Sequence, residues 1–186
     1  MNSNTPARMV VVKKEEKELK LRALIAHAIA NAPTTGLEMR VLAVSLTSPV
    51  AVAVCALRAE LAAAGVAARI MLVKNLTGPE ASSLVDSSVR HLADSRCHDA
   101  HELLVLGNET AWIGDSLRRE PASRDSFELH AFHDRKTAHF VAQSFERIWQ
   151  LALPLRPRED LPALGLAASL SALTAPADTA QAMTRH

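Results

Sequence analysis

The stretch His101–Ser116, HELLVLGNETAWIGDS, decides the fold. It contains two short apolar runs, Glu102–Leu106 (ELLVL) and Thr110–Gly114 (TAWIG), which are separated by Gly107-Asn108-Glu109. Glycine and asparagine tolerate the positive φ angles that tight connections between antiparallel strands require. The stretch therefore predicts a β-hairpin.

Upstream of the hairpin, the sequence predicts two strands joined by a helix. Met39–Leu46 and Ala67–Val73 are short apolar runs of the kind found in buried strands. Between them, a Ser-Pro pair suits the start of a helix and Gly65 suits the position after its end, so we expect a helix over Pro49–Ala64. The short connections on both sides indicate a right-handed, parallel β-α-β unit.

Two further helices are expected from apolar residues at helical spacing. The first begins at Lys14, ends before Pro33 and has the stripe Leu21, Leu24, Ile25, Ala28, Ile29 and Ala32; the last has the stripe Ala138, Val141, Ala142, Phe145, Ile148, Trp149 and Ala152. Other expected elements are strands at Ser88–Leu92 and Ser126–His133 and a short helix at Pro79–Leu84, whereas Met9–Val12 is apolar without a clear period. The pattern predicts an α/β fold, a mixed sheet flanked by helices.

The composition narrows the class of protein. The 186 residues include 21 Lys or Arg and 20 Asp or Glu, the formal net charge is +1, and 48% of the residues are hydrophobic. This is enough apolar material for the core of one domain, but it lacks the basic excess of a dedicated nucleic-acid binder, so nucleic acid is not an expected partner. No apolar run is long enough for a membrane span, and two cysteines, Cys55 and Cys97, suit a reducing compartment. We expect a cytoplasmic protein.

Three regions are expected along the chain. Residues 1–13 form an N-terminal extension, residues 14–153 form the α/β domain, and residues 154–186 form a flexible tail rich in Pro and Ala. Within the tail, Leu161–Leu173 could form a loosely docked helix.

Several common catalytic and cofactor motifs are missing. Ser45, Ser48 and Ser116 lack the Gly-x-Ser-x-Gly context that exposes a serine nucleophile, and the six glycines are too scattered for a Walker or dinucleotide fingerprint. Cys97, His98 and His101 lie close to Asp94 and Asp99, but this spacing fits no standard zinc knuckle and no second Cys/His pair completes it. The sequence therefore predicts no metal and no cofactor.

Two groups of polar residues remain as candidates for a site. His130 and His133 would point to opposite faces of a continuing strand, so one of them could face a cleft. Arg118, Arg119 and Arg124 have the guanidinium forks that suit phosphate, yet acidic residues are interleaved with them. The alternatives of an anion site and a solvated, self-neutralising loop stay open here.

The hairpin resembles the catalytic hairpin of the phospholipase D superfamily. The family motif is His-x-Lys, four residues and Asp, followed by an apolar strand that ends in Gly-Gly or Gly-Ser. The similarity covers roughly residues 16–152 and includes the order of elements and the closing helix with SFERIW. It implies a phospholipase D-like half-domain, in which a second motif copy comes from another chain, so a homodimer is the expected assembly.

The motif departs from the family pattern in both possible registers. Alignment on Gly114 places Ala100 at the family's nucleophilic His, Glu102 at the Lys and Gly107 at the Asp. A shift by one residue restores His101 but leaves Leu103 at the Lys and Asn108 at the Asp. The family chemistry needs the lysine to stabilise phosphoryl oxygens, so hydrolysis of the family type is not expected, and a lysine from elsewhere in this hollow would contradict that interpretation.

Three hypotheses about function follow. The first is a non-catalytic phospholipase D-like domain with a ligand-binding or regulatory role, which takes a small anionic ligand or a protein partner. Its candidate site consists of His101, Glu102, Asp115, Ser116, Arg118, Arg119 and His130, with no confident catalytic residue and His101 as the candidate. The second is a diverged phosphodiesterase or phosphotransfer enzyme that uses His101 or His130, with Arg118 and Arg119 as an anion clamp. The third is a dimerisation module whose tail recruits a partner.

Overall fold

A computed structural model describes residues 6–31, 36–74 and 88–154. A mixed sheet of eight strands forms its centre, in the order β1-β7-β6-β5-β2-β3-β4-β8. The elements along the chain are β1 (Arg8–Val12), η1 (Lys14–Glu16), α1 (Lys17–Ala30), β2 (Glu38–Ala43), α2 (Pro49–Ala56), α3 (Arg58–Ala63), β3 (Ala67–Leu72), β4 (Val89–His91), η2 (Ser95–Asp99), β5 (His101–Leu106), β6 (Thr110–Ser116), η3 (Pro121–Ser123), β7 (Ser126–Ala131), α5 (Arg135–Trp149) and β8 (Leu153–Pro154).

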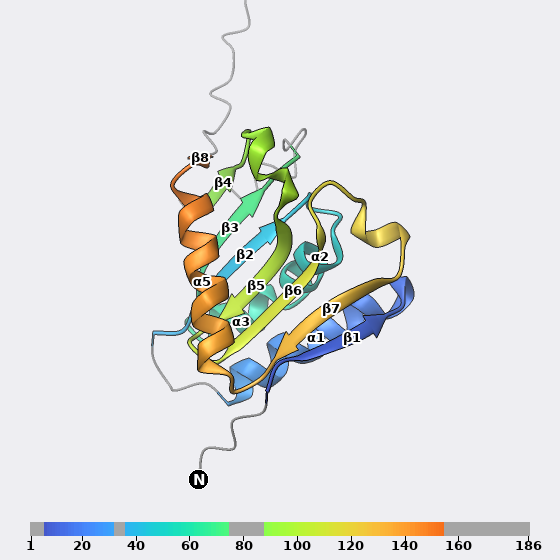
Figure 1. The fold of residues 1–186 in the computed structure, drawn as a ribbon. Coiled ribbons are helices and arrows are strands. Elements are labelled where there is room, and N and C mark those ends of the chain that lie inside the picture. Colours follow the sequence, from blue (N-terminus) through green and yellow to red (C-terminus); the bar gives the residue numbers. More distant parts are fainter. Residues whose placement is uncertain (1–5, 32–35, 75–87, 155–186) are drawn as a thin grey trace, which may run out of the picture. The chain divides into compact units, whose positions relative to one another are not determined.

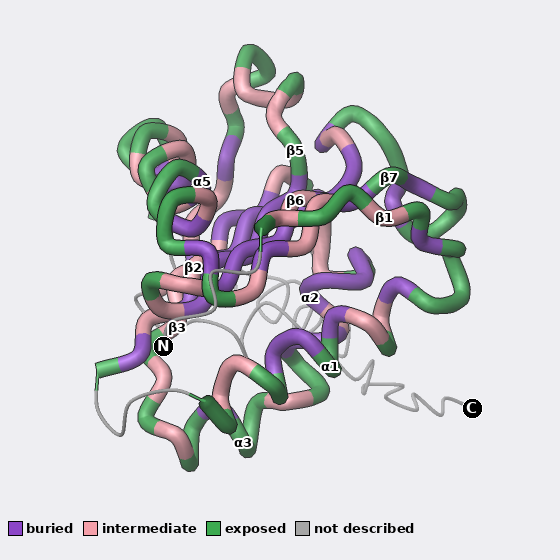
Figure 2. The backbone as a smooth tube through the Cα atoms, turned by 60° about the horizontal axis from the view of Figure 1, so that its bottom comes forward, coloured by how far each residue is buried: buried purple, intermediate pink, exposed green. Residues whose placement is uncertain are grey.

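Helices cover both faces of the sheet, which gives three layers (Figure 1). On one face, α1 and α2 pack over β2, β5 and β6, with Leu21, Val50 and Leu104 in their core. On the other face, α5 packs over the same strands, with Leu42, Val105 and Phe145 in a second core. Figure 2 shows that the central strands are buried, whereas β1 is largely exposed. The predicted α/β class, a mixed sheet flanked by helices, is confirmed.

The two decisive sequence predictions are confirmed by the strand pairing. β5 and β6 are antiparallel neighbours, with Leu106 opposite Thr110 across the turn, where Gly107 has a φ of 62°. β2 and β3 are parallel neighbours, connected through α2 and α3. A parallel pair needs such a crossover because the chain must return to the starting edge of the sheet.

Three features differ from the sequence prediction. The helix expected over Pro49–Ala64 is interrupted at Leu57, so that the buried α2 is followed by the more exposed α3. The first helix begins at Lys17, since Lys14–Glu16 forms a 3-10 turn. Finally, β1 was not expected; it pairs antiparallel with β7, with Met9 opposite Leu129. The expected helices at Pro79–Leu84 and Leu161–Leu173, and the tail itself, lie outside the described residues.

The closing helix is fixed at its start and along its buried side. The Asp134 side chain accepts a hydrogen bond of 3.1 Å from the backbone N–H of Thr137, which caps the first turn. Val141, Phe145 and Trp149 are buried, in agreement with the predicted stripe. Among the described helices, none combines the length and the apolar character that crossing a bilayer requires.

Candidate functional site

The far end of the β5–β6 hairpin contains a bulge. His101 lies opposite Ser116 and Leu103 lies opposite Ile113, so two residues of β6, Gly114 and Asp115, face the single residue Glu102. Bulges bend a strand and redirect its side chains, and they are common next to functional sites. Here the bulge brings Asp115 to a concave surface.

A cavity of about 660 Å³ opens at this end of β6 and β7. We call it the Asp115 pocket. It contains three of the seven candidate residues from the sequence, His101, Asp115 and Arg119. The rest of its lining comes from β1, β6, β7 and the loop before β7, namely Met9, Ile113, Gly114, Arg124, Asp125, Ser126, Phe127 and Leu129.

Asp115 is the polar centre of the pocket and is only 8% exposed. Its Oδ1 accepts a hydrogen bond of 2.8 Å from the backbone N–H of Ser116 and a longer one of 3.4 Å from Nη1 of Arg119. Its Oδ2 is buried and accepts no hydrogen bond from the described residues, although Nε of Arg124 lies 3.7 Å away. A buried carboxylate oxygen without a donor is costly unless something else supplies one.

The two arginines give the pocket its charge. The side chains of Arg119 and Arg124 are 56% and 50% exposed, and both lie beside the same carboxylate. Each guanidinium has five N–H donors, so one contact with Asp115 leaves most of them available. The pocket therefore combines a buried acceptor with two half-exposed cationic side chains.

Glu102 does not share this pocket. Its side chain is 1% exposed, and Oε1 accepts a hydrogen bond of 3.0 Å from the backbone N–H of Val44 at the end of β2. Burial raises the pKa of Glu102 to about 7, while the Val44 N–H, the Ser48 hydroxyl and the charge of Lys17 act against that rise. Glu102 is not among the residues that line the Asp115 pocket, so its predicted role in binding a ligand there finds no support in its position.

Sequence reasoning missed a buried lysine near Glu102, which lies outside the Asp115 pocket. Lys17, at the start of α1, is 2% exposed, and its Nζ donates a hydrogen bond of 2.6 Å to the Pro121 carbonyl. Its charge is near enough to lower the pKa of Glu102. Lys17 is not among the residues that line the Asp115 pocket, so its ammonium group lies in the interior of the domain and not in the pocket. Lys17 lies one turn before Leu21, on the apolar stripe of α1. This position is the sequence signal from which its burial could have been predicted.

His130 belongs to another buried group, on the side of β7 opposite to Phe127 and Leu129 of the pocket lining. Glu128 is 1% exposed and accepts hydrogen bonds of 2.8 Å from Nε1 of Trp112 and 3.2 Å from Oγ of Ser126. Nε2 of His130 lies 3.2 Å from Oε2 of the same glutamate. Sequence reasoning missed Glu128, although polar residues at every second position, Ser126, Glu128 and His130, mark one side of the strand.

The remaining candidates lie on the outside. Arg118 is 62% exposed and its Nε lies 2.7 Å from Asp99, and the Ser116 hydroxyl oxygen accepts a long hydrogen bond of 3.4 Å from the Arg118 backbone. Asp94 caps the η2 turn and binds Arg96. Within residues 6–31, 36–74 and 88–154, no three His, Cys, Asp or Glu side chains converge as metal ligands.

Comparison with known proteins identifies the fold. No protein-family model matches the sequence, and no curated protein matches it. Among solved structures, the phospholipase D family member Nuc from Salmonella typhimurium superposes with a TM-score of 0.55 and 16% identity, over 82% of this chain and 100% of that one. The chain has a phospholipase D-like fold.

Two other solved structures also resemble the phospholipase D-like fold of this chain. NucT from Helicobacter pylori has a TM-score of 0.55 and 13% identity, over 81% of this chain and 99% of that one. The archaeal chromatin protein TrmBL2, described as showing a novel mode of DNA binding, has a TM-score of 0.50 and 17% identity, over 83% of this chain and 56% of that one. At these identities the likeness concerns the fold alone.

Proposed function

We propose that this chain is a non-catalytic phospholipase D-like domain that binds a small anionic ligand in the Asp115 pocket. The observation that carries the proposal is the buried Oδ2 of Asp115, which lacks a hydrogen-bond donor among the described residues, below the guanidinium groups of Arg119 and Arg124. A hydroxyl or amine of the ligand would satisfy that oxygen. The arginines would bind an anionic group of the same molecule.

The ligand class follows from this pairing of groups. An anion without a hydrogen-bond donor would be attracted by the guanidinium groups of Arg119 and Arg124, but it would be repelled by the carboxylate of Asp115. A molecule that carries both a phosphate and a hydroxyl, such as a phosphosugar, a nucleotide or a phosphoglycerol headgroup, matches both halves of the pocket. His101 lines the same pocket and adds a donor or acceptor according to its protonation.

A non-catalytic role is supported by the residue at the motif's lysine position. In the register that aligns Gly114, this residue is Glu102, whose buried carboxyl is held by the Val44 N–H. A carboxyl there opposes the negative charge that develops on a phosphoryl group. Lys17 does not replace the missing group in the pocket, since it is buried and is not among the residues that line it.

The expectation about nucleic acid needs revision. The near-neutral net charge argued against such a partner, but the DNA-binding description of TrmBL2, which has the same fold, does not fit that argument. Net charge alone therefore excludes no partner here. We also propose that the chain forms a homodimer and is located in the cytoplasm.

Thermal unfolding with defined probes tests the pocket. Glucose 6-phosphate, AMP and glycerol 3-phosphate are compared with glucose, adenosine and glycerol. We expect a phosphorylated probe to raise the Tm of the full chain, and Arg119→Gln/Arg124→Gln to abolish the rise. The matched control is Lys20→Gln/Arg22→Gln on α1, where the same charge is removed from surface ion pairs. The proposal fails if no phosphorylated probe raises the Tm, or if the arginine variant responds like the wild type.

A further inference from the structure

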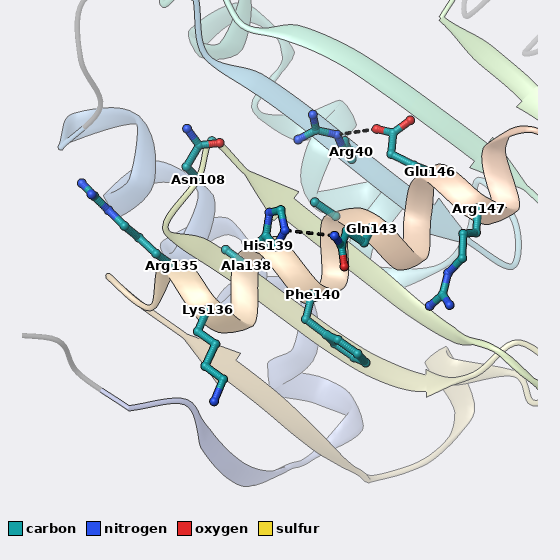
Figure 3. A pocket seen from close by; sticks show the side chains of 12 residues that line it. Arg40, Asn108, Arg135, Lys136, Ala138, His139, Phe140, Gln143, Glu146 and Arg147 are labelled. Carbon is teal, nitrogen blue, oxygen red and sulfur yellow. Dashed lines mark hydrogen bonds and ion pairs between the residues drawn. The ribbon is translucent and has the colours of Figure 1, made fainter.

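A second concave surface, separate from the Asp115 pocket, runs along the outer side of α5. It encloses about 920 Å³ and is lined by the exposed side of the helix, by Arg40 of β2 and by the hairpin turn at Gly107 and Asn108 (Figure 3). We call it the α5 groove. It shares no lining residue with the Asp115 pocket.

The groove has an excess of cationic side chains in a chain whose net charge is only +1. Its lining includes four Arg or Lys side chains, Arg40, Arg135, Lys136 and Arg147, against the single carboxylate of Glu146. That carboxylate is neutralised from the sheet, because Nε of Arg40 and Nη1 of Arg69 each lie 3.0 Å from it. Arg40 and Arg69 are therefore balanced by Glu38 and Glu146, which leaves the other three cations to set the charge of the groove.

Lys136 and Arg147 are the available cations of the groove. Arg135 is paired with Glu109, whereas in the described part of the chain no carboxylate lies within ion-pair distance of Lys136 or Arg147. Among the described residues, the side chain of Arg147 donates one hydrogen bond, from Nη2 to the Ser144 hydroxyl at 3.2 Å. The two residues are separated by eleven positions, which corresponds to about 16 Å along a helix axis.

An exposed aromatic ring lies between these two cations. Phe140 is 62% exposed, and in Figure 3 it projects from the same side of α5 as Lys136 and Arg147. Asn108, His139 and Gln143 add neutral hydrogen-bonding groups, and the last two contact each other at 3.0 Å. An aromatic ring flanked by cations is the arrangement on which single-stranded nucleic acids bind, because the ring stacks on a base while the cations contact phosphates.

We propose that the α5 groove binds single-stranded nucleic acid, with the backbone phosphates on Lys136 and Arg147 and a base stacked on Phe140. The aromatic ring favours this occupant over two others. The bases of a duplex are already stacked on one another, and an acidic peptide would use the cations but would have no base to stack on Phe140. The neutral amides would contact base edges or sugar hydroxyls without selecting a sequence.

Fluorescence anisotropy with a labelled dT20 oligonucleotide, at salt concentrations from 50 to 200 mM, tests the proposal. We expect Lys136→Gln/Arg147→Gln to weaken binding at least tenfold and to reduce the slope of log K against log salt by about 1.4, since each phosphate contact on a single strand contributes about 0.7. Phe140→Ala should weaken binding by roughly tenfold with the slope unchanged, because it removes stacking and no charge.

The control variant is Lys13→Gln/Lys14→Gln, which removes the same charge from exposed lysines outside the groove. Circular dichroism and the Tm establish that each variant is folded. Equal weakening by the control, no binding by the wild type, or tighter binding of a duplex of equal length would overturn the proposal. So would wild-type affinity in Phe140→Ala, or binding of polyglutamate with the affinity of dT20. The Asp115 pocket has its own assay, the Tm shift with small phosphorylated probes, so the failure of one proposal is distinguishable from the failure of the other.

Discussion

The backbone N–H of Val44 donates a hydrogen bond of 3.0 Å to Oε1 of Glu102, 58 residues away in sequence. The contact ties the end of β2 to the start of β5. Because the glutamate is 1% exposed, its charge is poorly solvated, and burial raises its pKa to about 7. The carboxyl is therefore a structural connection whose protonation changes near neutral pH.

Stability should depend on pH through Glu102. Its pKa rises from 4.5 in the unfolded chain to about 7 in the folded one, so the folded state binds the proton more tightly. The stabilising effect of this proton is complete below pH 4.5 and is lost as the pH rises through 7, which lowers the free energy of unfolding by about 3 kcal/mol. Glu102→Gln keeps an acceptor for Val44 and should remove this dependence. Urea unfolding of both proteins between pH 4.5 and 8.5 gives the comparison, and parallel pH profiles would refute the assignment.

Lys17→Met should destabilise the protein and change that profile. The substitution retains the buried stem but removes the 2.6 Å hydrogen bond to the Pro121 carbonyl, which we expect to cost about 1–3 kcal/mol. Loss of the nearby positive charge should also raise the pKa of Glu102 further, so the decline in stability would extend to higher pH. The same urea series measures both effects. In the Glu102→Gln background, Lys17→Met should still lower the free energy of unfolding but should no longer change its pH dependence. If the pH dependence still changed there, the charge of Lys17 would not act through Glu102.

Gly114→Ala should disrupt the packing of Trp112. A Cβ atom at this position would lie 2.3 Å from Cη2 and 2.5 Å from Cζ2 of the indole ring, so the ring has to move. We expect a loss of about 3 kcal/mol from overpacking, together with a changed near-UV circular dichroism spectrum. Gly65→Ala is the matched control, because its φ of 63° is strained for alanine but no atom lies within 4 Å of the added carbon. If both variants lose equal stability, the contact with Trp112 is not what requires glycine at position 114.

Much of the fold could be predicted because its decisive signals are local. The β5–β6 hairpin and the β2–α2–α3–β3 crossover depend on turn residues and apolar runs within short stretches. β1 lacked such a signal. Its partner β7 lies far along the chain, and its apolar side chains Met9 and Val11 are 63% and 57% exposed, so burial did not impose an alternating pattern on the sequence.

Three of the predicted site residues lie in one pocket, for a geometric reason. His101, Asp115 and Arg119 do come together, because strand pairing and a tight loop place them at one end of the sheet. Glu102 was grouped with them by sequence proximity, yet its side chain leads into the interior, as alternation along β5 requires. In β7 the polar residues Ser126 and Glu128 are buried and Phe127 is 70% exposed, the reverse of the usual pattern. The hydrogen bonds of Glu128 with Trp112 on β6 and with its own strand neighbours Ser126 and His130 explain that inversion.

The central claim is that the phospholipase D-like scaffold binds without catalysing phosphodiester hydrolysis. The direct measurement is turnover of bis-(p-nitrophenyl) phosphate by the full chain between pH 5.5 and 8.5, beside His101→Ala and His130→Ala. The account predicts a wild-type rate that does not exceed buffer or either variant. A wild-type rate above buffer that disappears in His101→Ala or His130→Ala would contradict it and would establish a diverged phosphodiesterase.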